Sequence, residues 1–159
     1  MFYPAFHMDE PKRIRQAVWI LAVALATVGL GPCGPIAGGA LTGSEFSEAV
    51  DDWSFANDAE QCAVEVRPSD PHSVTVNCMS WERRLFVSCS DCDGKTWSAV
   101  AVADPNGRIR IAERIYPVHL THVEESNLLD AVWRARAGKL GEDESARPAG
   151  WWTFELRSR

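Results

Sequence analysis

Cysteine is the residue type with the widest chemical reach in this sequence of 159 residues. Thiols can pair as disulfides, bind zinc or act as a redox couple, depending on their spacing and their compartment. Of the five cysteines, one lies in an uncharged N-terminal stretch, and the other four are Cys62, Cys78, Cys89 and Cys92. This even number favours two structural disulfides if the chain works in an oxidising compartment.

The C-x-x-C motif from Cys89 to Cys92 allows three interpretations. Redox-active motifs of this form usually sit at the N-terminus of a helix, which favours the thiolate. Here the flanking residues predict the end of a strand, and the negative charges of Asp91 and Asp93 disfavour a thiolate. We therefore expect a structural loop disulfide and no metal site. A catalytic dithiol and a zinc site built from all four cysteines are the alternatives.

His119 and His122 are three residues apart on an expected strand. Side chains alternate between the two faces of a strand, so these histidines point to opposite sides and cannot share a ligand. Either histidine alone could bind haem, but a surface or packed histidine is the simpler interpretation. Because the sequence contains no HExxH zinc motif and no glycine-rich phosphate loop, it identifies no catalytic residue.

Two stretches of apolar and polar alternation must position the first pair of cysteines. Residues 62–67 and 73–78 alternate with a period of two, which predicts half-buried strands joined by a turn. If this hairpin is symmetric about Asp70, Cys62 lies directly opposite Cys78, at a separation that suits a disulfide. Two buried free thiols are the alternative. The outward face of the hairpin would carry Glu65, Arg67, Thr75 and Asn77.

The rest of the sequence predicts further strands and one helix. Strands are expected at Arg84–Ser88, Trp97–Ala103, Arg108–Ala112, Ile115–Val123 and Trp151–Leu156. Asp104–Gly107 predicts a hairpin turn, because Asn-Gly tolerates positive φ. A helix is expected from an N-cap at Ser126 to a stop at Gly138. About six antiparallel strands and one amphipathic helix indicate a mainly β, α+β domain that forms a small barrel rather than a sandwich.

The N-terminal region has the pattern of an export or anchor segment. An uncharged run from Gln16 to Ser44 follows a cluster of three basic residues at positions 12, 13 and 15. Its apolar part, Ala17–Leu30, has the length of a signal-peptide core and spans a membrane only if it continues beyond the following prolines. We expect a hydrophobic helix that is either a retained anchor or a cleaved signal, with lipidation of Cys33 as a further alternative.

The basic cluster should stay in the cytoplasm by the positive-inside rule. The sequence therefore divides into a cytoplasmic stub with an anchor or signal, residues 1–44, and a domain, residues 45–159. That domain is expected on the outer side of the membrane, in the periplasm of a bacterium, or secreted after cleavage. It carries 13 basic and 20 acidic side chains, a formal charge of −7. This charge argues against nucleic acid as a partner, because binding nucleic acid needs clustered Lys and Arg. Asp51 and Asp52 are expected to be a solvated pair.

The stretch from Arg84 to Tyr116 carries a resemblance to a known family. It contains Gly94-Lys95-Thr96-Trp97, then Ala103-Asp104-Pro105, then a basic strand of alternating arginine and isoleucine from Arg108. This order resembles the pyridoxamine phosphate oxidase-like split barrels, which include flavin-binding oxidases and deazaflavin-dependent reductases. The similarity covers roughly Trp53 to Val123.

The resemblance implies a cofactor site in the loop before the expected Lys/Trp strand. Lys95 would contact the cofactor phosphate, Thr96 would add a hydroxyl, and Trp97 would line the site. FMN or a deazaflavin is the implied cofactor, haem is a less favoured one, and binding of no cofactor is a further alternative. The implied activity is that of an oxidoreductase, completed across a homodimer, because split barrels commonly pair.

Two positions favour a different interpretation. Several superfamily members carry an asparagine where this chain has Val100, and the family's oxidases tend to have a serine where it has Asp93. A carboxylate at the second position would repel a phosphate. These differences favour a non-catalytic accessory module that kept the barrel, lost the cofactor and works with membrane-protein partners.

Overall fold

The computed structural model of the protein describes residues 38–67, 69–143 and 145–159. The chain divides into two units, Met1–Ile36 and Ala37–Arg159. The expected hydrophobic helix and the lipidation site at Cys33 lie outside the described residues. Within the described ranges, no helix is both long and apolar enough to cross a membrane.

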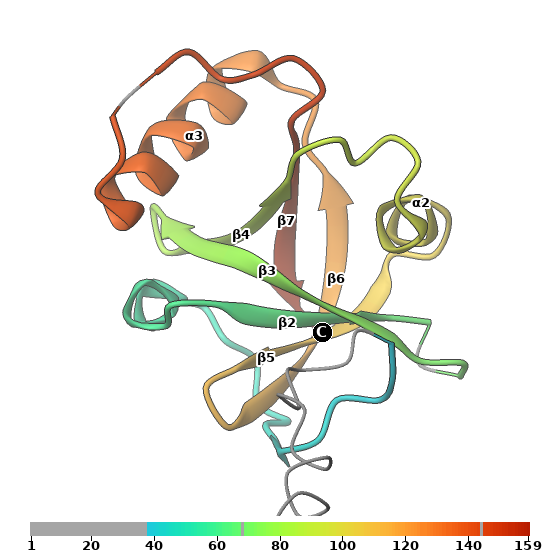
Figure 1. The fold of residues 1–159 in the computed structure, drawn as a ribbon. Helices are drawn as coiled ribbons and strands as arrows, with labels where there is room; N and C mark the ends of the chain where they lie inside the picture. The colour runs from blue at the N-terminus through green and yellow to red at the C-terminus, as the bar shows by residue number, and fades with distance from the viewer. Residues whose placement is uncertain (1–37, 68, 144) are drawn as a thin grey trace, which may run out of the picture. The chain divides into compact units, whose positions relative to one another are not determined.

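The described part of the chain forms one seven-stranded sheet that closes into a barrel (Figure 1). Six antiparallel strands follow one another in the order β6-β5-β2-β3-β4-β7, and β7 pairs back with β6. The short β1 pairs with β6 in parallel. The strands are β1 (Ser44–Glu45), β2 (Cys62–Val66), β3 (His72–Trp81), β4 (Arg84–Cys89), β5 (Asn106–Ile111), β6 (Arg114–His122) and β7 (Trp152–Ser158). The predicted mainly β barrel is confirmed.

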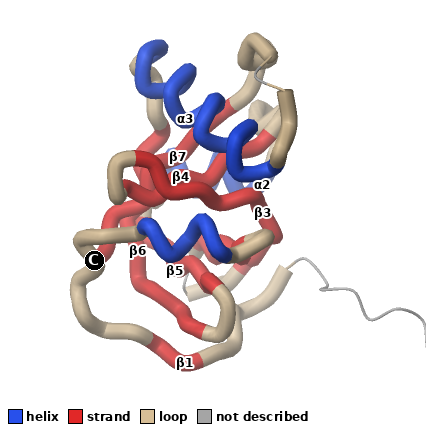
Figure 2. Tube along the Cα trace, turned by 90° about the vertical axis from the view of Figure 1, so that its left-hand side faces the viewer, coloured by secondary structure: helices blue, strands red, loops and turns tan. Residues whose placement is uncertain are grey.

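The helices lie outside the ring of strands (Figures 1 and 2). They are the 3-10 helix η1 (Ser54–Asp58) and the α-helices α2 (Thr96–Ala103) and α3 (Ser126–Leu140). Helix α3 covers the outer face of β3 and β4, where Leu129 and Val132 pack with Met79 and Phe86. It runs past the predicted stop at Gly138, because the left-handed residue that ends it is Gly141, with φ of 66°.

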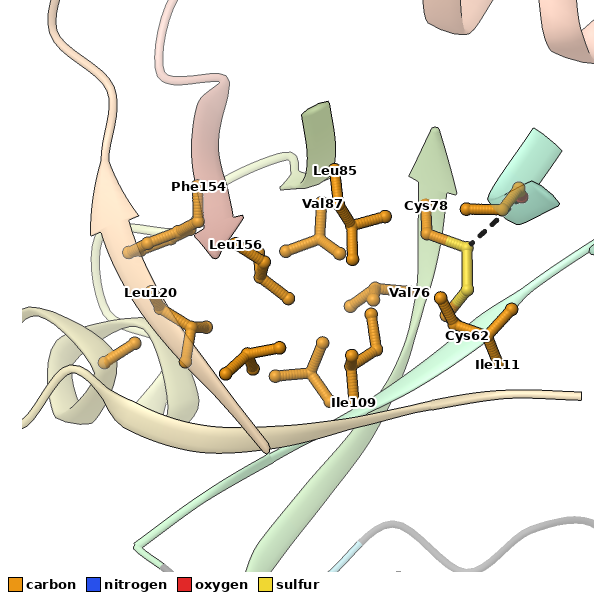
Figure 3. Packing of buried hydrophobic residues seen from close by; sticks show 14 of the residues in the cluster. Cys62, Val76, Cys78, Leu85, Val87, Ile109, Ile111, Leu120, Phe154 and Leu156 are labelled. Carbon is orange, nitrogen blue, oxygen red and sulfur yellow. Dashed lines mark hydrogen bonds between the residues drawn. A yellow bond between two sulfur atoms is a disulfide. The ribbon is translucent and has the colours of Figure 1, made fainter. Parts of the chain in front are cut away.

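Apolar side chains fill the interior of the barrel. Figure 3 shows them pointing toward one another from all six strands. The members with less than 2% exposure include Val64, Val66, Leu85, Val87, Ile109, Val118, Leu120, Phe154 and Leu156. A packed interior is the source of most of the hydrophobic stabilisation. It also means that a ligand of this barrel binds on the outer surface.

Both disulfides expected from the cysteine spacing are present. Cys62 pairs with Cys78 and Cys89 pairs with Cys92, with Cα–Cα distances of 5.8 and 5.7 Å. The predicted register was wrong by two residues, because Cys62 lies opposite Val76 and the first disulfide joins diagonal neighbours. The turn centres one residue earlier than Asp70, whose N–H donates to the carbonyl of Arg67. A shift of two residues keeps both cysteines on the inner face.

The segment predicted as a strand at Trp97–Ala103 is helix α2. Its mixture of apolar and small residues fits either element, and its alanines favour a helix. The helix covers one end of the barrel, where Trp97 and Ala101 join the core. The hairpin turn predicted at Asp104–Gly107 was therefore also wrong. Asp104 caps α2, and Asn106 already begins β5.

A buried ion pair holds residues 38–46 against the outside of the barrel. Glu65 on β2 lies opposite Arg108 on β5, and the guanidinium donates from Nε and Nη2 to the two carboxylate oxygens, each at 2.8 Å. The backbone N–H of Leu41 donates to the same carboxylate at 2.6 Å, and Arg108 also reaches Glu45 at 2.8 Å. Glu65, predicted on the solvent face, is fully buried because this segment covers it.

A second ion pair links β4 and β7 on the outer face of the barrel. Arg84 on β4 donates twice to Glu155 on β7, at 3.0 and 2.7 Å, and Arg157 reaches the same carboxylate at 3.1 Å. The hydrogen bonds from Arg84, more than those from Arg157, lower the pKa of Glu155 below its usual value. Glu155 is therefore ionised at neutral pH, and its charge is balanced within the sheet.

Candidate cofactor site

The residues implied by the family resemblance lie at the start of α2. Lys95 is the N-cap residue of this helix, in an extended conformation, and no side chain caps the helix. Gly94 precedes it with φ of +102°, a value that side-chain-bearing residues rarely adopt. The first N–H groups of a helix have no partner within the helix and carry partial positive charge. This end of α2 is therefore electropositive, and Lys95 adds a full charge to it.

The three predicted site residues have different surroundings. Lys95 and Thr96 are exposed at the surface. Trp97 is only 5% exposed, and its ring packs against Phe154 with a centroid distance of 5.3 Å. Lys95 and Thr96 can thus reach a ligand on the outer surface, whereas Trp97 anchors the helix on the core and positions its two neighbours.

The loop before α2 is fixed by covalent and polar contacts. The Cys89–Cys92 disulfide joins the end of β4 to this loop, and both cysteines are buried. The hydroxyl of Ser98 donates to the carbonyl of Cys92 at 2.6 Å, and Nζ of Lys95 donates to the carbonyl of Ser90 at 2.7 Å. With Cys89 and Cys92 joined as a disulfide, the C-x-x-C motif has a structural role, because it fixes the position of the start of α2.

The two positions that depart from the superfamily lie in the same region. Asp93 is exposed two residues before Lys95, so its carboxylate faces solvent near the helix start. Val100 is half-buried and packs against the core cluster. A polar side chain at that position would lie beside apolar residues, so the local packing accounts for the valine.

The two histidines lie apart, as their spacing predicts. His119 is exposed on β6. His122 is half-buried, and its ring lies 4.6 Å from that of Trp152 and 5.3 Å from that of Phe154. The contact explains His122 as a packed aromatic side chain.

A cavity of about 800 Å³ lies at the far end of β5, and no pattern in the sequence predicted it. Its lining comes from two segments, residues 46–59 and residues 111–116. The only signal in the sequence was aromatic residues flanking Asp51 and Asp52, and nothing in the sequence linked them to Tyr116. None of the three residues at the start of α2 lines this cavity.

Comparison with known proteins gives matches among solved structures. A proposed pyridoxamine 5′-phosphate oxidase from Listeria innocua matches with a TM-score of 0.54 and 7% identity, over 66% of this chain and 88% of that chain. A proposed 5-nitroimidazole antibiotic resistance protein from Bacteroides thetaiotaomicron matches with a TM-score of 0.52 and 10% identity, over 70% and 82%. The FAD and heme binding protein from Mycobacterium smegmatis matches with a TM-score of 0.50 and 11% identity, over 67% and 64%.

No protein-family model matches the chain, and no curated protein matches it. The structural matches cover most of the described domain, and they include a protein named for flavin binding. They confirm the resemblance drawn from the sequence at the level of architecture. The domain therefore shares the split-barrel fold of these solved structures.

Proposed function

We propose that the domain binds the phosphate of FMN or of a deazaflavin at the start of α2 and acts as an oxidoreductase-like protein. The observation that carries the proposal is that a split barrel places Lys95 and Thr96 at an uncapped helix start. The N-terminus of a helix favours anions, because its free N–H groups and its dipole both attract them. A bound flavin would supply hydride-transfer chemistry.

The residues at this site fit a phosphate group in type and in exposure. The ammonium group of Lys95 has three donors, and the carbonyl of Ser90 uses one of them. The hydroxyl of Thr96 lies at the first helical position and is open to solvent. Trp97 takes no part in the contact, and its role is to fix the helix on the barrel.

Titration of the full chain with chromophores tests the proposal. The protein is produced by export, so that both disulfides form, extracted in mild detergent and titrated with FMN, a deazaflavin, riboflavin and haem. We expect saturable absorbance changes with the two phosphate-bearing flavins and binding of riboflavin at least about tenfold weaker, as loss of charged hydrogen bonds predicts. Equal binding of riboflavin and FMN would contradict a phosphate site.

Lys95→Ala should weaken FMN binding by roughly tenfold, because it removes one charged hydrogen-bond donor. Binding of riboflavin should not change, since riboflavin has no phosphate. The matched control is Arg134→Ala, which removes an exposed positive charge from α3. An equal loss of affinity in both variants would indicate a general effect of net charge and would remove Lys95 from the site.

We also propose that the domain lies outside the cytoplasm, retained by its N-terminal segment or secreted after cleavage. The two disulfides support this location, because disulfides persist in oxidising compartments. The basic cluster before the apolar run supports the same orientation. Protease added to cells with a permeabilised outer envelope should digest the domain, and complete protection until the inner membrane is lysed would argue for a cytoplasmic domain.

A second candidate function is a binding module without cofactor, working with membrane-protein partners or as a homodimer. Asp93 and Val100 favour it, since one adds a negative charge near the helix start and the other offers no polar group. The same titration separates the two functions. Saturable flavin binding that depends on Lys95 would exclude the module, whereas no change with any of the four chromophores would favour it.

A further inference from the structure

An aromatic cavity lies at the end of β5 opposite to α2. Helix α2 leads into the start of β5 (Figure 1). The residues that line the cavity include the last residue of β5 and the turn that joins β5 to β6. Its volume of about 800 Å³ is within the range of roughly 300 to 1,000 Å³ typical of small-ligand sites. It is therefore separate from the site proposed for the cofactor.

Three aromatic side chains form the apolar wall of this cavity. The ring of Tyr116 lies at the centre, with centroid distances of 5.3 Å to Phe46 and 5.7 Å to Phe55. The buried ring of Trp53 packs edge-on against Tyr116 at 5.3 Å and supports it from the core side. Phe55 is 38% exposed, an unusual exposure for a large apolar side chain in this domain. Tyr116 and Trp53 are thus fixed in the core, and Phe55 is an accessible ring of this wall.

The charged lining of the cavity is almost all negative. Four carboxylates and one guanidinium line it, from Asp51, Asp52, Asp58, Glu113 and Arg114. Asp52 is held ionised, because hydrogen bonds from Ser54 lower its pKa. Arg83 pairs with Asp52 at 3.0 Å and offsets one of these charges. Lys139 also interacts electrostatically with Asp58. Four carboxylates against the three cations Arg83, Arg114 and Lys139 leave a net negative charge, so the cavity disfavours an anion and favours a cation.

The chain's own Arg114 already shows how a cation sits on this wall. Its guanidinium carbon lies 5.8 Å from the centroid of the Phe46 ring, within the range of a cation–π contact. The ring of Phe46 is itself held in place, because the N–H of Phe46 donates to the carbonyl of Ile115 at 2.8 Å. Phe55, which is 38% exposed, offers the same kind of surface to a second cation, with the buried Tyr116 ring behind it.

We propose that this cavity binds a small organic cation with an apolar group, such as an alkyl- or aryl-ammonium ion. The apolar group packs on Phe55 and Tyr116, and the ammonium group lies among the carboxylates of the rim. Recognition of ammonium ions by aromatic side chains is a recurring use of cation–π contacts. Four carboxylates around an aromatic wall add charge complementarity, which sets the sign of the ligand.

Three probes that share one aromatic ring but differ in charge test whether the cavity prefers a cation. The full chain, labelled with ¹⁵N, is titrated with benzyltrimethylammonium, benzyl alcohol and phenylacetate. We expect shifts of the amide signals of residues 111–116 with the cation, and at least about tenfold weaker binding of the neutral and anionic probes. Equal affinity for the alcohol, or no binding of the cation, would overturn the proposal.

Variants of the rim and wall locate the site. Glu113→Gln should weaken binding of benzyltrimethylammonium by about threefold to fivefold, and Phe55→Ala should weaken it by a similar factor. The matched control is Glu124→Gln, an exposed carboxylate that follows the other end of β6. An equal effect of Glu113→Gln and Glu124→Gln would show a response to net charge alone and would reject the site.

A second copy of the chain could instead cover the aromatic wall. In that case the signals of residues 111–116 would shift with protein concentration in the absence of any probe, and the cation would compete with self-association. We expect no such concentration dependence. Its presence would assign the cavity to an interface between copies and would overturn the proposal of a small-molecule site.

Discussion

Arg108→Met should lower the free energy of unfolding by roughly 3 to 5 kcal/mol, because it leaves a buried carboxylate without a cation. Glu65 has no solvent exposure, and Arg108 provides two of its hydrogen bonds. Water cannot replace the lost donors at this position, since residues 38–46 cover it. The midpoint and slope of a urea unfolding curve, followed by tryptophan fluorescence, measure the change.

Two further variants show whether the isolated charge is the cause. Glu65→Gln combined with Arg108→Met should be more stable than Arg108→Met alone, because the amide is neutral and its carbonyl still accepts from Leu41. Arg83→Met, which removes an exposed partner of Asp52, should change stability far less than Arg108→Met does, because solvent screens exposed ion pairs. A similarly small effect of Arg108→Met would contradict the importance of the buried pair.

Replacing both Cys62 and Cys78 by alanine should destabilise the domain by about 3 kcal/mol in the chain-entropy treatment of disulfides. This bond closes a loop between residues separated by 16 positions, and it links β2 to β3 within the core. Each alanine also leaves space where a buried sulfur was packed, which adds to the loss. Urea unfolding of the oxidised protein again gives the change.

The second disulfide provides the comparison. Cys89 and Cys92 are separated by three positions, so their replacement by alanine should cost about 2 kcal/mol, less than the loss for the longer loop. Both pairs are buried, which makes the packing losses alike. A larger loss for the short loop would show that loop closure is not the main source of stabilisation. It would point instead to the packing around the start of α2.

Most of the strands could be predicted because alternation reports which residues face the core, and the number of strands indicated a small barrel. The period of two placed Cys62 and Cys78 on one face, and that face assignment survived an error of two residues in the register. The error arose because the alternation does not specify the centre of the turn. Hydrogen bonding between Asp70 and Arg67 decides it, and that contact has no signature in the pattern.

Helix α2 could not be separated from a strand by its sequence. Its alternation of valine with alanine fits both periods, and its type depends on the barrel end that it covers. The Asn-Gly pair that suggested a hairpin turn serves close packing instead. A side chain on Gly107 would meet the carbonyl oxygen of Glu65 at 2.6 Å, so only glycine fits between β2 and β6 at this point.

The two candidate ligand sites differ in how much of each could be predicted from the sequence. Lys95 and Thr96 are adjacent in the chain, so a short motif was enough to bring them together. The aromatic cavity joins Phe46 and Phe55 to Tyr116, which follows them by 70 and 61 residues in the chain. The pairing of β1 with β6 brings Phe46 beside Tyr116. Asp51 and Asp52 are exposed, as predicted for a solvated pair, but they stand at the rim of a cavity.

The position of β7 also determines when the domain can form during protein synthesis. This strand lies between β4 and β6 and is the last of the seven to leave the ribosome. Until it has emerged, the earlier strands form an open sheet whose β4 and β6 edges lack a partner, a state prone to pairing with other chains. The barrel therefore closes only after translation of residues 152–158. A nascent chain that stalls before them is left with two unpaired strand edges, on β4 and β6.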